Sequence, residues 1–354
     1  MAFLLFWGLR CLSSEILARG ILIFMLVEPG GLAFPKFILS EVWFLPFFLG
    51  AILCVGFFYR SNRLILLVLA GVLTGAAAYV RPAILYFPIL VVGLLLFSPD
   101  RIKERVQRII AFSLPYLILL TPWYVRNYSH FHAFTFSGIK GVQLMEYHVP
   151  FVWESARGIP FNEGRKIIKE KARALVSREQ ARLGRPLNIM EIFSLYQKIG
   201  LQELSRYPGN YLKQWIYGIL KTVGGSNLTE IYILTGWHQD RIHFFDVAEP
   251  SFSKKIYRFL SRQDGFLLLE VFVRFMIALG AGIGAVAIIR QRASLMWIIL
   301  LANIYFLAIP GPVGYSRYRF PVESLWFIQS WVGYRFFGDL MHKRGWLRRS
   351  SFLS

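Results

Sequence analysis

The sequence predicts an all-α polytopic membrane protein, with about eight transmembrane helices and a helical extracytoplasmic region between the fifth and sixth. Three observations lead to this fold class. Hydrophobic residues make up 56% of the 354 residues, and charged residues make up 17%, against about a quarter in soluble domains. Apolar runs of roughly membrane-spanning length recur along the chain. Basic residues collect in alternate loops between these runs.

Apolar periodicity and length define the expected spans, of which the first and fourth are short for a bilayer. They lie near residues 14–28, 41–59, 63–80, 83–98, 108–125, 265–289, 294–312 and 320–338. The expected organisation is a helix bundle with an outward-facing site over 1–125, an extracytoplasmic helical region over 126–264, C-terminal transmembrane helices over 265–340, and a basic cytoplasmic tail over 341–354.

Orientation follows from the positive-inside rule, which places short loops rich in Lys and Arg in the cytoplasm. The basic residues of these loops are Arg10, Arg19, Arg60, Arg63, Arg101, Lys103, Arg105, Arg108, Arg290, Arg292, Lys343, Arg344, Arg348 and Arg349. Every second loop is therefore cytoplasmic, and segment 126–264 faces outward. The predicted location is the cell inner (plasma) membrane, crossed several times.

The net charge of +20 would suggest nucleic acid in a soluble protein. Here the loop pattern explains it, and no Gly-Lys-Ser/Thr phosphate loop or zinc finger is present, so no nucleic-acid partner is predicted. The two cysteines, Cys11 and Cys54, give no disulfide framework and are expected to be small core residues.

Within 126–264 the sequence predicts three helices. A charged helix runs from about Asn162 to Arg182 and ends at Gly184. Asn188 and Glu191 form a capping box that opens a second helix, which the segment 207–209 ends. The third, 210–222, has an apolar face that could pack either on the membrane surface or under the other helices. Two sequons, at Asn127 and Asn227, fall in or near this region.

Charged residues at the ends of spans are the main functional signal, because a charge in or near the bilayer is costly unless it is paired or hydrated. Interfacial snorkelling is the competing interpretation, and it suits Lys36 well. The predicted outward set comprises Glu28, Glu41, Arg81, Arg126, Arg317, Arg319 and Glu323. Glu270 and Arg274, four residues apart on one helix, are expected to pair with each other and receive no chemical role.

Glu41 opens a span, and the helix N-terminus would stabilise its carboxylate. Arg81 lies in a tight turn, where its planar guanidinium could form two parallel hydrogen bonds to a phosphate. Arg317 and Arg319 flank Tyr318, which forms a site for an anion and a stacked ring. Together these residues suit a lipid-linked phosphosugar. The arginines would hold its phosphate, and the carboxylate would either act as base on an acceptor hydroxyl or hold a divalent metal ion, so a metal cofactor stays open.

The motifs also resemble those of a known family, the bacterial GT-C glycosyltransferases of the dolichyl-phosphate-mannose mannosyltransferase-like and aminoarabinose-transferase-like group. The similar segments occur in the family's order and cover about residues 14–338. They are Ser40-Glu41 at a helix start, Gly71 to Arg81-Pro82, Pro122-Trp123 to Arg126-Asn127-Tyr128, the glycine-containing loop Ser137–Gly141, Pro208-Gly-Asn-Tyr211-Leu212, and Arg317-Tyr-Arg319-Phe-Pro321-Val-Glu323.

This resemblance implies an integral membrane glycosyltransferase that moves a sugar from a polyprenyl-phosphate donor to a cell-envelope acceptor, which would be a membrane lipid, a surface glycan or a protein. Glu41 would be the second acidic site residue, with Glu28 as a further acidic candidate. The donor phosphate would contact Arg81, Arg317 and Arg319. The cavity would be lined by Arg126, Lys140, Tyr318 and Glu323.

The family places its principal catalytic Asp in the first outward loop. The first ten residues of this chain are typical of the tail of a membrane helix, so the chain is expected to begin beyond that loop, as an N-terminally truncated member. Two other functions stay open. One is an inactive or partial GT-C homologue that lacks the catalytic loop. The other is a transporter or flippase of lipid-linked sugars, which predicts broken midplane helices and paired repeats that the sequence does not display.

Overall fold

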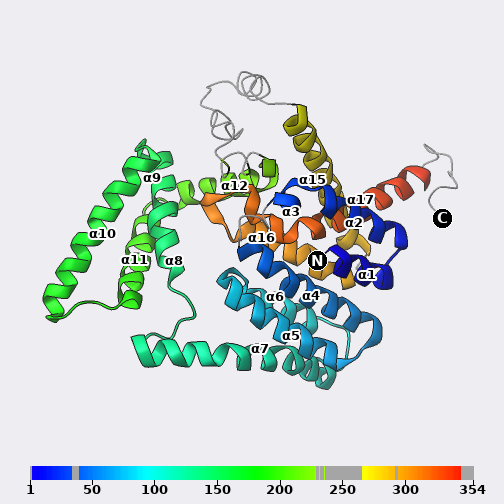
Figure 1. Ribbon diagram of the computed structural model, residues 1–354, viewed down its shortest axis with the longest axis horizontal. Helices are drawn as coiled ribbons and strands as arrows, with labels where there is room; N and C mark the ends of the chain where they lie inside the picture. The colour runs from blue at the N-terminus through cyan, green and yellow to red at the C-terminus, as the bar shows by residue number, and fades with distance from the viewer. Residues whose placement is uncertain are drawn as a thin grey trace. The chain divides into compact units, whose positions relative to one another are not determined.

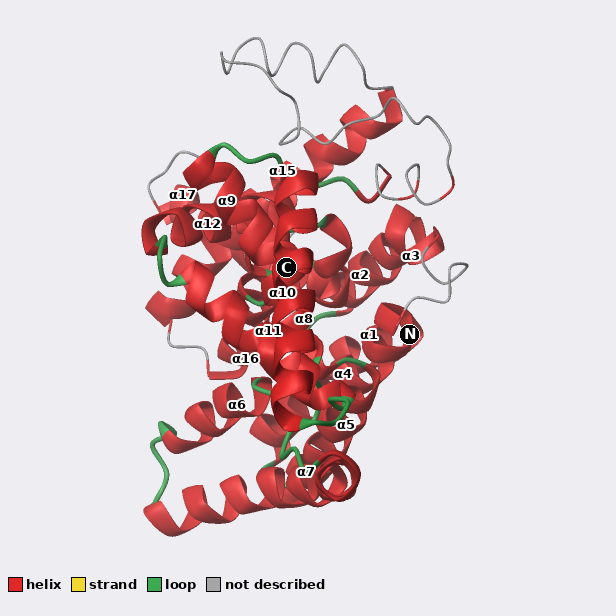
Figure 2. Cartoon of the chain, turned by 90° about the vertical axis from the view of Figure 1, so that its left-hand side faces the viewer, coloured by secondary structure: helices red, strands yellow, loops and turns green. Residues whose placement is uncertain are grey.

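The computed structural model describes residues 2–33, 40–228, 231, 235, 265–291 and 294–343, and within these residues all regular structure is helical (Figure 1, Figure 2). The all-α prediction is therefore confirmed for this part of the chain. The helices of eight residues or more are α1 (Ala2–Leu12), α2 (Glu15–Val27), α4 (Ser40–Ser61), α5 (Leu64–Val80), α6 (Phe87–Leu96), α7 (Ile102–Phe131), α9 (Val149–Arg157), α10 (Phe161–Leu183), α11 (Ile189–Leu204), α12 (Pro208–Gly224), α15 (Gly265–Gln291), α16 (Ser294–Ala308) and α17 (Glu323–Lys343).

Short helical turns connect several of these elements. They include α3 (Pro29–Ala33), α8 (Ile139–Gln143), a π-helical turn at Leu144–His148, and 3₁₀ turns at Pro82–Ile84, Gly311–Val313, Ser316–Tyr318 and Phe320–Val322. The last three turns carry the arginine motif into α17. They lead into α17 without a long loop, and they direct Arg317 and Arg319 to different neighbours.

Three helices are long and apolar enough to cross a membrane. These are the segments Ser40–Ser61, Ile102–Phe131 and Leu267–Arg290. Shorter apolar helices cover Leu64–Val80, Pro82–Leu96 and Met296–Ala308. Each segment that the sequence marks as apolar contains a helix, and three of them meet the requirements of a span, so the membrane assignment has structural support.

The fourth apolar segment differs from the continuous span that the sequence predicts. A 3₁₀ turn at Pro82–Ile84 is followed by Leu85 and Tyr86, and α6 begins only at Phe87. Two prolines explain the break, because Pro82 and Pro88 each lie in the first turn of a new helix and cannot donate a backbone hydrogen bond to a preceding one. The ten residues of α6 rise roughly 15 Å, about half of a bilayer core.

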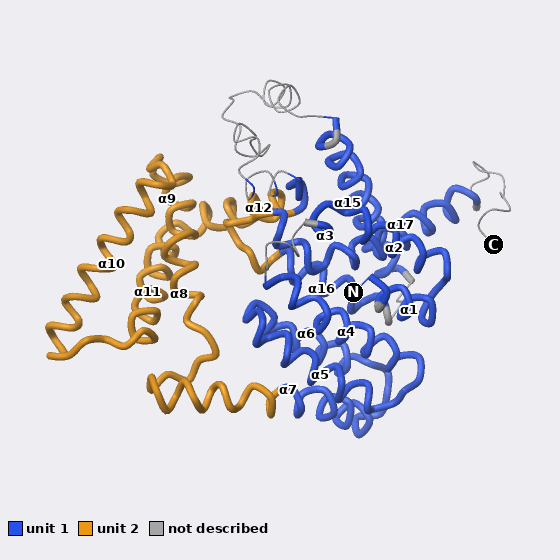
Figure 3. The backbone as a smooth tube through the Cα atoms, in the orientation of Figure 1, with its two compact units in different colours: residues 1–116, 223–307, 316–354 blue, residues 117–222, 308–315 orange. Residues whose placement is uncertain are grey.

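The chain divides into two compact units (Figure 3). The first comprises Met1–Tyr116, Val223–Leu307 and Ser316–Ser354, and the second comprises Leu117–Thr222 and Ala308–Tyr315. Helix α7 contributes its first half to one unit and its second half to the other. The second unit begins a few residues before the predicted extracytoplasmic region, whose residues 236–264 lie outside the described part of the chain.

Small residues allow close helix packing in the first unit, where α4 packs along α5 and α15 along α17. A Cβ atom added at Gly284 would lie 2.1 Å from the backbone oxygen of Gln329, and one at Gly333 would lie 2.0 Å from that of Gly280. Gly280 and Gly284 are four residues apart on α15. This is the small-residue spacing that lets membrane helices approach at backbone distance.

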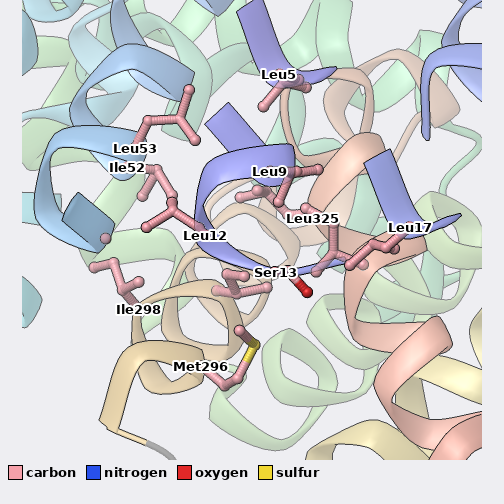
Figure 4. A pocket seen from close by; sticks show the side chains of 13 residues that line it. Leu5, Leu9, Leu12, Ser13, Leu17, Ile52, Leu53, Met296, Ile298 and Leu325 are labelled. Atoms are coloured by element: carbon pink, nitrogen blue, oxygen red, sulfur yellow. The ribbon is translucent and has the colours of Figure 1, made fainter. Parts of the chain in front are cut away.

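The first helix also belongs to this unit. Leucine side chains of α1 surround a cavity of about 40 Å³ together with residues of α2, α4, α16 and α17 (Figure 4). The lining is almost entirely aliphatic, with Ser13 as its polar member. A cavity of this size and polarity is a packing gap rather than a ligand site. Cys11 is exposed, so the expectation that it is a core residue is wrong, and Cys54 is only partly buried. On α1, the side chains of Leu5 and Leu9 are buried.

The second unit has its own core, centred on Met145, Val149, Trp153, Ile168 and Ile199. The helices predicted here are confirmed. Helix α10 ends at Gly184, which has the left-handed φ of +62° that favours glycine.

The capping box is present as well, since the Asn188 side chain accepts hydrogen bonds from the backbone N–H groups of Met190 and Glu191. Helix α12 begins at Pro208, because proline at the first helical position loses no hydrogen bond.

Helix α12 keeps part of its apolar face uncovered. Leu212, Ile216 and Leu220, spaced four residues apart, are each about half exposed. Packing under other helices therefore does not account for this stripe, and contact with the membrane surface stays a prediction. The sequon residues Asn127 and Asn227 are both fully buried, so neither is accessible to a glycan in the folded chain.

Candidate functional site

Glu41 and Arg81 come together at one end of the α4–α5 pair, because α4 begins where the antiparallel α5 ends. The Arg81 Nη1 atom lies 2.9 Å from Glu41 Oε1. Glu41 is buried in the first turn of α4, where the helix N-terminus stabilises its negative charge. Ser40 donates a hydrogen bond of 3.2 Å to the other carboxylate oxygen. Arg81 stands at the C-cap of α5 and keeps some exposure to solvent.

Tyr318 lies next to this pair and contacts two guanidinium groups. Its ring centroid is 6.0 Å from the Arg81 Cζ atom and 5.3 Å from that of Arg317. Cations at these distances are attracted by the ring's negative face. Two arginines and one carboxylate leave a formal charge of +1 around one aromatic ring, all within the first unit. We call Glu41, Arg81, Arg317 and Tyr318 the candidate site.

Arg319, the other arginine of the motif, belongs to a different cluster. Its side chain is almost fully buried, and Nε donates to Glu323 Oε1 at 3.1 Å. Its Nη1 and Nη2 atoms donate to the backbone oxygens of Val223 and Gly225, at 2.7 and 2.9 Å. The guanidinium therefore joins the end of α12 and the residue after it to the start of α17.

Arg274 is the centre of the same cluster. Its Nε donates to Glu270 Oε1 at 2.6 Å, which confirms the expected pairing of these two residues. Its Nη2 atom also donates to Glu28 at 2.7 Å, and its Nη1 atom pairs with Glu323. We call Glu28, Glu270, Arg274, Arg319 and Glu323 the buried ion cluster. Three carboxylates and two guanidiniums give it a formal charge of −1.

Asn227 and Ser226 complete the buried ion cluster. The Asn227 Nδ2 atom donates to Glu28 at 2.7 Å and to Glu323, and its backbone N–H donates to Glu270 Oε1 at 2.9 Å. Ser226 donates its hydroxyl to Glu270, and its carbonyl accepts from Ser316 at 3.0 Å. The sequence marks Asn227 only as part of a sequon. Its partners are far away along the chain, so no local pattern could have indicated this role.

A cavity of about 220 Å³ lies beside the buried ion cluster. Glu28, Glu323 and Ser324 form its polar wall. Its other walls are mostly apolar and include Val42 and Leu45, which follow Glu41 on α4. The Ser324 hydroxyl is buried and has no hydrogen-bond partner among the described residues. The cavity thus combines an aliphatic wall with a polar end, as an amphiphilic ligand requires.

The other predicted site residues, Arg126 and Lys140, belong to the second unit. Arg126 lies over the Trp123 ring at 4.7 Å and donates to Asn127 Oδ1 at 2.9 Å, while Lys140 is exposed on α8. Their place in a donor cavity stays a prediction. Among residues 2–33, 40–228, 231, 235, 265–291 and 294–343, no group of three or more His, Cys, Asp or Glu side chains is arranged to hold a metal ion.

The structure thus separates the predicted residues into three places. Glu41, Arg81, Arg317 and Tyr318 gather at the candidate site, and Glu28, Arg319 and Glu323 belong to the buried ion cluster. Arg126 and Lys140 lie in the second unit. Comparisons of the chain with protein-family models, with curated proteins and with solved structures find no match.

Proposed function

We propose that the chain is an integral membrane glycosyltransferase that moves a sugar from a polyprenyl-phosphate donor to a cell-envelope acceptor. The observation that carries the proposal is the pair of guanidiniums, Arg81 and Arg317, on the ring of Tyr318 beside the carboxylate of Glu41. A phosphate binds well to guanidinium groups that are held in place, because each can donate two parallel hydrogen bonds to it. A sugar ring packs well on an aromatic face. A buried carboxylate next to both supplies a base.

In the proposed reaction, the acceptor hydroxyl gives its proton to the Glu41 carboxylate as its oxygen forms a bond to the anomeric carbon of the sugar. The bond between that carbon and the phosphate oxygen breaks, and its electron pair leaves on the polyprenyl phosphate. Arg81 and Arg317 stabilise the charge that develops on this leaving group. Glu41 must leave Arg81 during the cycle, and the donor phosphate is the group that would replace it.

The finer topology forms part of the proposal. Eight spans in the plasma membrane would place segment 126–264 outside the cell and the basic loops in the cytoplasm. The helices found at each predicted segment and the three that are long and apolar enough to span support this topology. The mostly apolar cavity of about 220 Å³ beside α4 would accept part of the lipid chain of the donor. The acceptor would be a membrane lipid, a surface glycan or a protein.

The test is donor binding and transfer in proteoliposomes that contain a radiolabelled polyprenyl-phosphate sugar. Arg317→Ala and Arg81→Ala should each weaken donor binding, by about tenfold or more for the loss of one charge-assisted contact. Tyr318→Phe keeps the aromatic face and should retain binding, whereas Tyr318→Ala should reduce it. Arg19→Ala is the matched control, since Arg19 pairs with Glu15 on an exposed helix surface.

The outcomes separate the competing functions. Unchanged donor binding in both arginine variants would contradict the proposal and leave their charges as interfacial anchors. Binding without transfer in the unmodified protein would instead indicate a donor-binding homologue without catalysis. Movement of the labelled lipid between leaflets, with the sugar still attached, would indicate a flippase.

A further inference from the structure

A third cavity, larger than the two described above, lies in the first unit, away from the residues of the candidate site. Its volume is about 910 Å³. It is formed by the end of α4, the end of α6, the loop before α7, the first part of α7, and α16. Its lining includes Asn62, Phe97, Asp100, Arg108 and Trp297. We call it the loop cavity. This volume is at the upper end of the range of ordinary small-molecule sites.

Arg108 is the buried charge in the wall of the loop cavity. Its Nη2 atom donates to Asn62 Oδ1 at 3.0 Å, its Nη1 atom pairs with Asp100, and the Phe58 ring centroid is 5.2 Å from its Cζ atom. Only 8% of Arg108 is exposed. These contacts fix the guanidinium in one orientation, so little side-chain entropy remains to be lost when a ligand binds.

A second arginine shapes the loop that carries Asp100. Arg105 Nε donates to the backbone oxygen of Asp100 at 2.7 Å, and its Nη1 atom donates to the backbone oxygen of Leu96 at 3.3 Å. The segments 60–63 and 98–108 together carry six basic and two acidic residues, a net charge of +4. Asp100 alone does not neutralise the surroundings of the loop cavity. An anion is therefore the ligand that this end of the unit favours.

The loop cavity lies at the level where a membrane interface is expected. Both α4 and α7 are long and apolar enough to span, and the cavity lies where α4 ends and α7 begins. Tyr59, Phe97 and Trp297 add aromatic side chains, which are enriched at membrane–water interfaces. Phe97 is 87% exposed, which costs little free energy if lipid covers it.

We propose that the loop cavity binds the phosphate-bearing headgroup of an anionic phospholipid. Arg108 and the basic residues around it attract the phosphate, and the aromatic side chains contact the glycerol and the first part of the acyl chains. Basic pockets between membrane helices on the cytoplasmic side are suited to such headgroups, and the charge of these loops assigns them to that side. The site does not depend on glycosyl transfer, so either proposal can fail without the other.

The test uses the intact protein in nanodiscs of phosphatidylcholine with increasing phosphatidylglycerol, and native mass spectrometry counts the retained lipids. Phe97→Glu places a negative charge at the exposed rim of the loop cavity and should lower phosphatidylglycerol retention by about fivefold, and Phe97→Lys should raise it by a similar factor. Phe134→Glu is the matched control, because Phe134 is 81% exposed and belongs to the second unit. The Phe134→Glu variant should retain as much phosphatidylglycerol as the unmodified protein does.

Arg108→Gln provides a second variant and should abolish the preference for phosphatidylglycerol over phosphatidylcholine. If that variant does not fold, the Phe97 pair decides. Equal retention in Phe97→Glu, Phe97→Lys and Phe134→Glu would overturn the proposal. Displacement of phosphatidylglycerol by millimolar inorganic phosphate or glycerol phosphate would overturn the assignment to a lipid and indicate a soluble phosphate ligand. Resistance to both soluble anions is the result expected for a lipid.

Discussion

The Glu41 carboxylate lies 2.9 Å from the Arg81 guanidinium, at the first turn of α4 and the C-cap of α5. The chain from Glu41 to Arg81 runs along both helices of a hairpin, so the pair closes the open end of that hairpin. This contact neutralises both charges in the structure described. Under the proposed function, a donor phosphate that binds Arg81 would release the carboxylate to accept a proton, so donor binding would be coupled to the appearance of the base.

This coupling predicts opposite effects on donor binding and on turnover for one substitution. Glu41→Gln removes the competing carboxylate and should leave donor binding equal or tighter, while turnover falls by about 10²–10⁴ because no base remains. Binding of the labelled donor and single-turnover transfer, measured in the same proteoliposomes, separate the two. If Glu41→Gln weakens donor binding and transfer in parallel, Glu41 acts in the structure of the site rather than as its base.

The buried ion cluster predicts a large loss of stability when Arg274 is removed. Arg274→Gln leaves buried carboxylates uncompensated and should cost about 3–5 kcal/mol of unfolding free energy. Arg19→Gln is the matched control. Arg19 and Glu15 have the same spacing of four residues and a similar distance of 2.7 Å, but their side chains are 69% and 46% exposed, against 8% and 7% for Arg274 and Glu270.

The exposed pair should contribute less than about 0.5 kcal/mol. Thermal unfolding in detergent micelles measures both variants. Similar midpoints for Arg274→Gln and Arg19→Gln would show that carboxylate protonation or water compensates the loss in the buried ion cluster.

Two glycines of α12 should respond in opposite directions to the same substitution. A Cβ atom at Gly218 would lie 1.9 Å from the backbone oxygen of Gly311, so Gly218→Ala must push helix and turn apart, at a cost of about 1–3 kcal/mol. Gly209 has nothing within 4 Å of its added Cβ. Gly209→Ala should stabilise the second unit by roughly 0.4–1 kcal/mol, because it reduces the entropy of the unfolded chain.

Hydrogen exchange of the α12 amides provides the measurement. Gly218→Ala should speed exchange and Gly209→Ala should slow it. Faster exchange in both variants would mean that the first turn of α12 also needs a glycine, for a reason that its open surroundings do not explain.

We expect the unfolding free energy of the second unit to decrease in acid because of His148. Its ring is buried in the π-helical turn, where the titratable group in contact is the Tyr211 hydroxyl, 3.4 Å from Nδ1. Burial lowers the pKa of His148 from 6.5 to about 4, because the charged imidazolium loses its hydration. The folded state therefore binds its proton less readily than the unfolded state does.

The stabilisation is complete above pH 6.5, is lost as the pH falls through the interval down to about 4, and does not change further below that. The total loss is up to about 3 kcal/mol. Hydrogen exchange of residues 144–157 in the intact protein, measured at a series of pH values, reports the unfolding free energy and checks this pH dependence. His148→Gln should flatten the profile over this interval. His130→Gln, at an exposed position, should leave it unchanged, and a profile that His148→Gln does not alter would assign the acid sensitivity to other groups.

Local patterns in the sequence were sufficient to predict most of the long helices, although not α9 or the break before α6. Apolar periodicity located α4, α5 and α15 within a few residues, because each must place an apolar surface against the protein or against lipid over its whole length. It located only the apolar middle of α7, whose polar ends continue the helix in both directions. The N-cap at Asn188 and the C-terminal glycine at Gly184 could likewise be predicted from the sequence, because helix capping involves atoms that are only three or four residues apart. The i,i+4 pair of Glu270 and Arg274 belongs to the same class.

The tertiary structure decided which charges meet. Arg317 and Arg319 are two residues apart, yet one lies at Tyr318 and the other in the buried ion cluster, because the 3₁₀ turns before α17 point their side chains to different neighbours. The contact of Arg274 with Glu28 joins residues that are 246 positions apart in the sequence. Side-chain type and spacing fix the chemistry that a residue offers. Its partner depends on how distant helices pack, which no local pattern contains.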